Sequence, residues 1–217
     1  MNETTKRIIK RMLPIVNVIP FINFYSMHNN TLIFGRKALF RCKIICHGRN
    51  NVIRFIGKGI LKNTKIVIWG NNNYLEIGDN SSVTDGDFCI ENDNNKITIG
   101  DNCAICGRTH IAVMEGTKII IGNDCMFSSG IVIRSGDSHS IIDLTGKRIN
   151  QSKNIMIGDH VWIGHDVKIN KGVSLQSNSI IGTGSVVTKA FTESNIIVAG
   201  NPAHIIKREI DWKKERL

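Results

Sequence analysis

The chain has 217 residues, enough for one domain with a sizeable core and short appendages. Its formal net charge of +10 favours an anionic partner such as nucleic acid, anionic lipid or a phosphorylated ligand. The basic residues gather near the two ends of the chain, however, and no zinc finger or aromatic RNA-binding motif is present. Sequence-specific binding to nucleic acid is therefore not expected.

The first 30 residues are expected to form a helical segment that caps the structure following it. Residues 2–12 are basic and partly apolar, and Pro14 would end a helix there. Alternatively, residues 1–25 contact an anionic membrane surface. Prolines and asparagines interrupt the apolar run from Leu13 to Phe24, so we expect neither a signal peptide nor a membrane-spanning helix.

A large apolar residue followed by glycine then recurs along the chain at intervals of 22, 21, 22, 22 and 36 residues. The pairs are Phe34-Gly35, Ile56-Gly57, Ile77-Gly78, Ile99-Gly100, Ile121-Gly122 and Ile157-Gly158. We interpret the interval of 22 as a triangular turn of three six-residue units with four extra residues at one corner. The interval of 36 is the same turn with a longer insertion. Residues 31–55 follow the pattern less clearly and predict irregular coils.

Six cysteines fall in this region, and Cys103-x-x-Cys106 has the spacing of a zinc or redox motif. However, Cys103 and Cys125 lie one 22-residue period apart, in line with Ser81, which favours a stacked row of small inward-facing side chains. We therefore expect no metal and reduced thiols, as in a cytoplasmic protein. A metal site at His160 and His165 is also disfavoured, because no further ligand pair accompanies them.

From Ile155 to Val187 an aliphatic residue returns at every sixth position, and a second series of small or β-branched residues lies four positions after the first. The first series is Ile157, Ile163, Ile169, Leu175, Ile181 and Val187, and the second is Val161, Val167, Val173, Ser179 and Ser185. A period of six fits neither an amphipathic helix nor an alternating strand. It predicts short parallel strands that stack coil upon coil, and hence an all-β solenoid over residues 31–200.

One long insertion interrupts the solenoid. A step of six beyond Ile133 falls on His139, where the core residue is lost and the chain leaves as a loop over residues 135–154. Because a solenoid gains no stability from interrupting its own core, this loop is where we expect chemistry. After Val187 we predict a short strand, a turn, and a C-terminal helix over residues 201–217 that covers the last coil.

Four motifs accompany the hexads: Ile133-Arg134-Ser135-Gly136-Asp137-Ser138-His139, Gly146-Lys147-Arg148-Ile149-Asn150, Ile157-Gly158-Asp159-His160-Val161-Trp162-Ile163-Gly164 and Ala199-Gly200-Asn201-Pro202-Ala203. With them, residues 121–208 resemble the hexapeptide-repeat acyltransferases, and most of all those that O-acetylate capsular polysaccharides such as polysialic acid. The resemblance implies a left-handed parallel β-helix, acetyl-CoA as acyl donor, and a homotrimer with active sites between subunits.

By this resemblance, His139 is the general base that takes the proton from a sugar hydroxyl, and Trp162 lines the active-site groove. A free imidazole has a pKa of about 6.5, so it accepts a proton at neutral pH and returns it to the leaving thiolate. Asp137 either orients the imidazole or forms a local turn. Further acetyl-CoA contacts are implied for Gly164, Gly182, Thr183, Ser185, Thr188 and Lys189. Either Lys189 or the pair of Lys207 and Arg208 is expected to meet the phosphates.

The acceptor is less well defined. Arg134, Lys147 and Arg148 are candidate contacts to an acidic sugar. The sequence has Ser128, Ser129 and Gly130 where the small-sugar acetyltransferases have an acceptor-binding asparagine, which weakens the case for a galactoside acceptor.

We therefore expect direct acetyl transfer to a sugar hydroxyl of a bacterial surface polysaccharide or its precursor, in the cytoplasm or at the inner membrane. The alternatives are an N-acetyltransferase of an amino sugar, an antibiotic acetyltransferase, and a non-catalytic β-helix scaffold.

Overall fold

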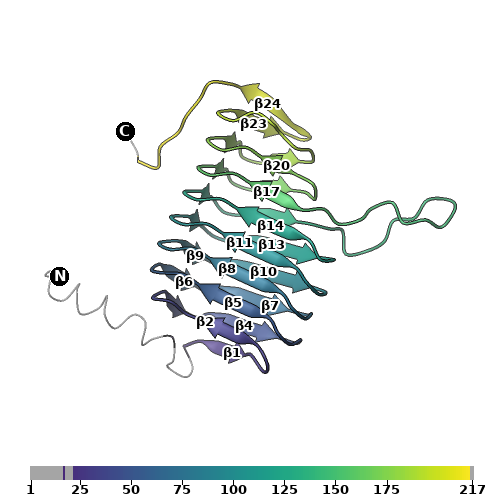
Figure 1. Cartoon of the computed structure of the whole chain (residues 1–217). Coiled ribbons are helices and arrows are strands. Elements are labelled where there is room, and N and C mark those ends of the chain that lie inside the picture. Colours follow the sequence, from purple (N-terminus) through teal and green to yellow (C-terminus); the bar gives the residue numbers. More distant parts are fainter. Residues whose placement is uncertain (1–16, 18–21, 216–217) are drawn as a thin grey trace, which may run out of the picture.

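The computed structural model describes residue 17 and residues 22–215, and these form a triangular solenoid of stacked coils (Figure 1). Successive coils contribute one strand to each of three sheets, in the fixed order A, B, C, except that the last coil passes from β22 of sheet A to β23 of sheet C without a strand in sheet B. Within the sheets, neighbouring strands from successive coils run parallel, with one antiparallel pair at the C-terminal end. The all-β parallel solenoid expected from the hexads is therefore confirmed.

The strands are short, as expected for a prism with tight corners. Sheet A contains β1 (Phe24–Ser26), β4 (Lys43–Cys46), β7 (Lys65–Ile68), β10 (Gly86–Glu91), β13 (Thr109–Met114), β16 (Val132–Arg134), β19 (Lys168–Ile169) and β22 (Val186–Val187). Sheet B contains β2 (Thr31–Ile33), β5 (Val52–Phe55), β8 (Tyr74–Ile77), β11 (Lys96–Ile99), β14 (Lys118–Ile121), β17 (Ile155–Ile157) and β20 (Ser174–Leu175). Sheet C contains β3 (Ala38–Phe40), β6 (Ile60–Lys62), β9 (Ser82–Thr84), β12 (Ala104–Ile105), β15 (Met126–Phe127), β18 (Trp162–Ile163), β21 (Ile180–Ile181), β23 (Ile197–Gly200) and β24 (Ala203–Lys207).

The hexad residues fill the prism interior. Ile157, Ile163 and Ile169 lie on β17, β18 and β19, one on each sheet, and all three belong to a single buried cluster. The second series, from Val161 to Ser185, is buried as well. Removal of this apolar surface from water is the main force that stabilises the coils.

The strand register confirms the two coil lengths. Tyr74 pairs with Lys96, one 22-residue coil further on, and Ile119 pairs with Ile155, 36 residues further on. The four-residue excursions and the long insertion all lie at one corner of the prism, between sheets A and B. The region expected to be irregular is regular instead, because β1 already pairs with β4 and β2 with β5.

A ladder of polar side chains holds the corner between sheets A and B. Asn51 Oδ1 accepts a hydrogen bond from the Asn73 backbone N–H (2.9 Å), and Asn73 Oδ1 accepts one from Asn95 (2.8 Å). Above them, the Thr117 N–H donates to Asn95 Oδ1 (3.2 Å), and the Thr117 hydroxyl donates to Ser135 Oγ (2.7 Å). The ladder satisfies buried backbone groups coil by coil, and it reaches the first residue of the long loop.

The stacked row of small residues is also confirmed. The Cys103 N–H donates to Ser81 Oγ (2.9 Å), and both Cys103 and Cys125 are buried. Cys106 is exposed, so the two thiols of the Cys103-x-x-Cys106 motif do not converge. All six thiols are unpaired.

The predicted C-terminal helix is wrong. Ala203–Lys207 is strand β24, which runs antiparallel to β23, and no helix follows in residues 208–215. The edge of sheet C presents unpaired backbone groups that a strand satisfies and a helix does not, and Ile205 packs against the core from this strand. Most of the predicted N-terminal helical segment, residues 1–16 and 18–21, lies outside the described residues. Toward its end the prediction is wrong, because Phe24–Ser26 is strand β1, which pairs with β4 of the next coil. Within the part of the chain that is described, no helix is long and apolar enough to cross a membrane.

One charged side chain lies fully inside the prism. Lys37 Nζ donates hydrogen bonds to the carbonyl oxygens of Lys58 (2.5 Å), Gly78 (2.6 Å) and Ser81 (3.1 Å). Gly59, at φ +128°, is packed closely against this site, because a Cβ there would lie 2.1 Å from the Ser81 carbonyl oxygen and 2.9 Å from Nζ. Burial lowers the pKa of Lys37 to about 8.

Candidate active site

The loop of residues 135–154 leaves the prism between β16 and β17 and projects far from it (Figure 1). Its two ends meet, because the Lys153 N–H donates to the Ser135 carbonyl (2.8 Å). Further out, Ile142 and Arg148 form an isolated antiparallel bridge. The loop is thus a closed excursion with a hydrogen-bonded neck.

Asn150 is the hub of this loop. Its Nδ2 donates to Asp137 Oδ2 and to the His139 carbonyl, both at 2.8 Å, and its Oδ1 accepts from the Ile141 N–H at 2.7 Å. The backbone on either side of His139 is therefore fixed, while the His139 residue itself is exposed. The sequence motif contained Asn150, but the motif alone gave no reason to assign it a role.

The carboxylate of Asp137 is held by Asn150 and by Lys171, with which it forms an ion pair. The hydrogen bond from Lys171 is the main cause that lowers the pKa of Asp137. Lys171 also donates to the Asn150 carbonyl (2.9 Å). Because Lys171 follows β19 in the next coil, it ties the loop to the scaffold, and Asp137 faces this lysine. An orienting role of Asp137 toward the His139 ring stays a prediction.

Two of the three candidate substrate contacts are held by the scaffold. Arg134 Nη1 lies 3.2 Å from His110 Nε2, and Nη2 donates to Ser138 Oγ (2.6 Å). Arg148 pairs with Glu115 (Nη2 to Oε1 2.8 Å), which lowers the pKa of Glu115. Lys147 is exposed at the outer part of the loop.

Trp162 lies on the outer face of sheet C and is 37% exposed. Its ring centroid is 6.0 Å from that of Trp212, which belongs to the C-terminal tail. Trp212 in turn stacks on His160 (4.1 Å between centroids, 9° between planes) and donates from Nε1 to the His160 carbonyl (2.9 Å). This contact could not be predicted from the sequence, because a single tryptophan in a basic tail belongs to no repeating pattern.

Gly164 and Gly182 lie one above the other at the corner between sheets C and A. The Gly164 N–H donates to the Ile181 carbonyl (2.8 Å), and a Cβ at Gly164 would lie 2.8 Å from that oxygen. Close stacking of the coils is thus sufficient to require glycine at Gly164. Thr183 is exposed at the same corner.

The remaining candidate cofactor residues are dispersed. Ser185 is fully buried and donates to the Gly182 carbonyl (2.6 Å), so its side chain faces the core. Thr188 and Lys189 are exposed after β22, at the corner between sheets A and B. Lys207 is exposed on β24. Arg208 forms a two-point ion pair with Glu193, from Nε to Oε2 (2.7 Å) and from Nη2 to Oε1 (3.1 Å).

The site residues therefore form two groups on different sides of one chain. The loop with His139 leaves from the corner between sheets A and B, whereas Trp162 lies on sheet C, which faces away from that corner. Figure 1 shows the loop on one side of the prism and the tail that contacts Trp162 on the other. A single chain does not bring the two groups together.

A parallel β-solenoid built from hexads, with one loop that presents a histidine, defines the class of hexapeptide-repeat β-helix proteins. Comparison with known proteins agrees. Residues 154–189 match the family described as bacterial transferase hexapeptide (six repeats). The polysialic acid O-acetyltransferase of Escherichia coli O1:K1 / APEC is 39% identical over 90 residues, which are 41% of this chain and 29% of that protein.

Solved structures match over a longer span. The polySia-specific acetyltransferase NeuO has a TM-score of 0.79 and 36% identity, over 86% of each chain. The polysialic acid O-acetyltransferase OatWY has a TM-score of 0.69 and 30% identity, over 90% of this chain and 92% of that one. The chain therefore belongs to the hexapeptide-repeat acetyltransferase family, and the expected enzyme class, an O-acetyltransferase of this type, is confirmed at the level of the family.

Proposed function

We propose that the protein transfers acetyl from acetyl-CoA to a hydroxyl of a bacterial surface polysaccharide or of its precursor. The family membership supports the reaction class, and the similarity to two polysialic acid O-acetyltransferases over most of their length supports an acidic polysaccharide as acceptor. The six unpaired thiols fit a cytoplasmic location.

In this proposal His139 is the general base. Its imidazole takes the proton of the acceptor hydroxyl as the oxygen attacks the thioester carbonyl, and the carbon–sulfur bond then breaks. The same imidazole returns the proton to the leaving thiolate, so no acyl-enzyme is needed. Asn150 acts as a positioning residue, because it holds the His139 carbonyl and leaves the ring free to reach the acceptor.

The separation of His139 from Trp162 within one chain carries a second part of the proposal, namely that each active site lies between two protomers of a homotrimer. The loop of one protomer would reach the sheet C face of its neighbour. Four large apolar side chains of the loop are exposed and would be covered by such a contact: Ile141, Ile142, Leu144 and Ile149. We also propose the left-handed coil that the resemblance implies.

Acetyl-CoA is proposed to lie along the corner of Gly164, Gly182 and Thr183, beside Trp162. Glycine corners let a ligand approach the backbone closely, and the exposed cation Lys207, on β24 of the same sheet C as Trp162, would meet its phosphates. Lys147, exposed on the loop, and Arg134 at its base are the proposed contacts to an acidic acceptor.

The test is acetyl transfer by His139→Ala, with His28→Ala, an exposed histidine of the first coil, as matched control. Loss of the base should lower kcat by roughly 10²- to 10⁴-fold, without change in thermal stability or oligomeric state. Turnover retained by His139→Ala would remove this residue from its proposed role. Release of the product acetyl group by mild alkali distinguishes an ester from an amide.

A further inference from the structure

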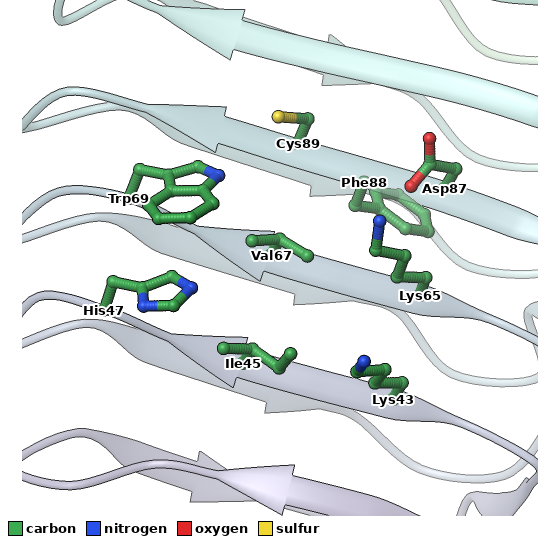
Figure 2. A pocket seen from close by; sticks show the side chains of 9 residues that line it. All are labelled: Lys43, Ile45, His47, Lys65, Val67, Trp69, Asp87, Phe88 and Cys89. Carbon is green, nitrogen blue, oxygen red and sulfur yellow. The ribbon is translucent and has the colours of Figure 1, made fainter.

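The outer face of sheet A carries a groove of about 270 Å³ that the active site does not use. Its side chains come from three strands, β4, β7 and β10, and from the residues directly after β4 and β7, and Figure 2 shows them in rows that follow the solenoid axis. The middle row, Ile45, Val67 and Cys89, is its floor. Burial raises the pKa of the Cys89 thiol to about 11, so the floor is uncharged at neutral pH.

One wall of the groove is aromatic. The rings of His47 and Trp69 stack with centroids 3.8 Å apart and planes at 8°, and Trp69 is 59% exposed. An indole left largely in water beside an apolar floor is unfavourable unless a ligand covers it. Apolar ring faces of sugars are suitable partners, because they pack on aromatic side chains while their hydroxyls stay in water.

The opposite wall is basic. Lys43 and Lys65 are direct partners across β4 and β7 and are exposed, and neither forms an ion pair with an acidic residue in the described part of the chain. On its other side, Lys65 lies directly opposite Asp87 of β10, whose carboxylate is engaged by His110 Nδ1 (2.8 Å). Lys43 Nζ lies 5.6 Å from the centroid of the Phe24 ring. Like charges directly opposite on neighbouring strands repel each other, and a ligand carboxylate placed beside Lys43 and Lys65 would relieve this repulsion.

The groove and the base of the loop lie along the same sheet, and the small side chain between them, Ala112, is fully buried. In the register of sheet A, Cys89 pairs with Ala112, and Ala112 pairs with Arg134. Arg134 donates to Ser138, the residue before His139. Since parallel strands are about 4.8 Å apart, the three steps from Val67 to Arg134 span about 14 Å. A ligand that fills the groove and continues along this face is therefore an extended chain.

We propose that this groove binds a distal segment of an extended, carboxylate-bearing acceptor glycan, whose sugar rings pack beside Trp69 and whose carboxylates pair with Lys43 and Lys65. The inference rests on the proposed function, since it assigns to the same acceptor a second contact remote from the loop. It predicts that long acceptors bind better than short ones through this face.

The experiment compares the wild type with Trp69→Ala and with the double variant Lys43→Gln/Lys65→Gln. The matched control is Lys62→Gln/Lys118→Gln, which removes two exposed lysines from sheets C and B. Long-chain polysialic acid and its disaccharide serve as probes, in calorimetric binding and in acetyl transfer. Each groove variant should bind the long chain roughly tenfold more weakly and raise its KM as much, with kcat and the KM values for disaccharide and acetyl-CoA unchanged.

The outcomes separate the groove from the proposed function. Loss of long-chain binding in the groove variants supports the groove even if the wild type transfers no acetyl. If the groove variants are active and their KM for the long chain is unchanged, the groove proposal is wrong and the proposed function stands. The groove proposal is also overturned if the control variant binds the long chain as weakly as the groove variants do. It is overturned if a single-stranded oligonucleotide binds the wild type as tightly as the long chain does and loses affinity in the same variants. Dissociation of the oligomer in the groove variants would overturn it too, since the face would then be a protomer interface.

Discussion

His139 and Trp162 lie on different sides of one chain, so subunit complementation can test whether each active site is shared between two protomers. The two variants are His139→Ala, defective in the loop, and Trp162→Ala, defective on sheet C. Each alone should have little activity. If every site combines the loop of one protomer with the sheet C face of the next, a protomer of each kind can together supply one intact site.

The fraction of activity that mixed trimers regain follows from the symmetry of the trimer. In a cyclic trimer that contains both variants, one of the three loop-to-face contacts joins an intact loop to an intact face, whichever variant is in excess. Mixed trimers should therefore regain about one third of wild-type activity, and an unsorted equal mixture about one quarter. A site within one protomer would regain none.

The assay needs co-expression of the two variants with different affinity tags, tandem purification of mixed oligomers, and measurement of acetyl transfer per protomer. A mixture of His139→Ala with the double variant His139→Ala/Trp162→Ala is the control, because it contains no intact loop and should stay inactive. Mixed oligomers that are isolated intact and show only the sum of the two parental activities would refute the shared site.

Three further predictions follow from single contacts. Asn150→Ala, which frees the His139 carbonyl, should lower kcat by roughly 10²-fold with little change in the KM for acetyl-CoA; an unchanged kcat in steady-state assays would contradict the positioning role. Burial lowers the pKa of Lys37 to about 8, so as pH rises from about 8 toward the unfolded pKa of about 10.5, the folded state has lost a proton that the unfolded state keeps. The wild type should then gain up to about 3 kcal/mol relative to Lys37→Met, whereas a pH-independent difference in urea unfolding would disprove the linkage. Trp212→Ala removes the stack on His160 and should speed tryptic cleavage of the tail at the same core melting temperature, and equal cleavage rates would show that the tail is held by other contacts.

The period of six was enough to predict the core, because each hexad residue repeats one environment on successive sheets. The same period located the loop, since His139 occupies a step where an aliphatic residue was due. The irregular coils expected over residues 31–55 and the C-terminal helix were wrong for a shared reason. Pairing with another strand determines the structure in both places, through Leu32 and Ile53 in successive coils and through Val198 and Ile205 in the C-terminal antiparallel pair. A pattern within one coil does not contain this information.

The parts of the site that sequence did not reveal are contacts between distant coils. Asn150 and Lys171 converge on Asp137 only because the neck of the loop sits above β19, and Trp212 reaches His160 across 52 residues of sequence. The groove beside Trp69 combines residues from three coils, each unremarkable in its own segment. The roles of His139 and Trp162 stay predictions, since they depend on how two chains meet.

The backbone hydrogen bond between Lys153 and Ser135, which closes the neck of the loop, has a practical consequence for protein engineering. Because the two ends of the excursion are already joined on the scaffold, the intervening residues can be exchanged as a cassette for those of a relative without shifting any strand out of register. If the loop contacts the acceptor as proposed, such chimeras should change the acceptor preference and leave the KM for acetyl-CoA unchanged.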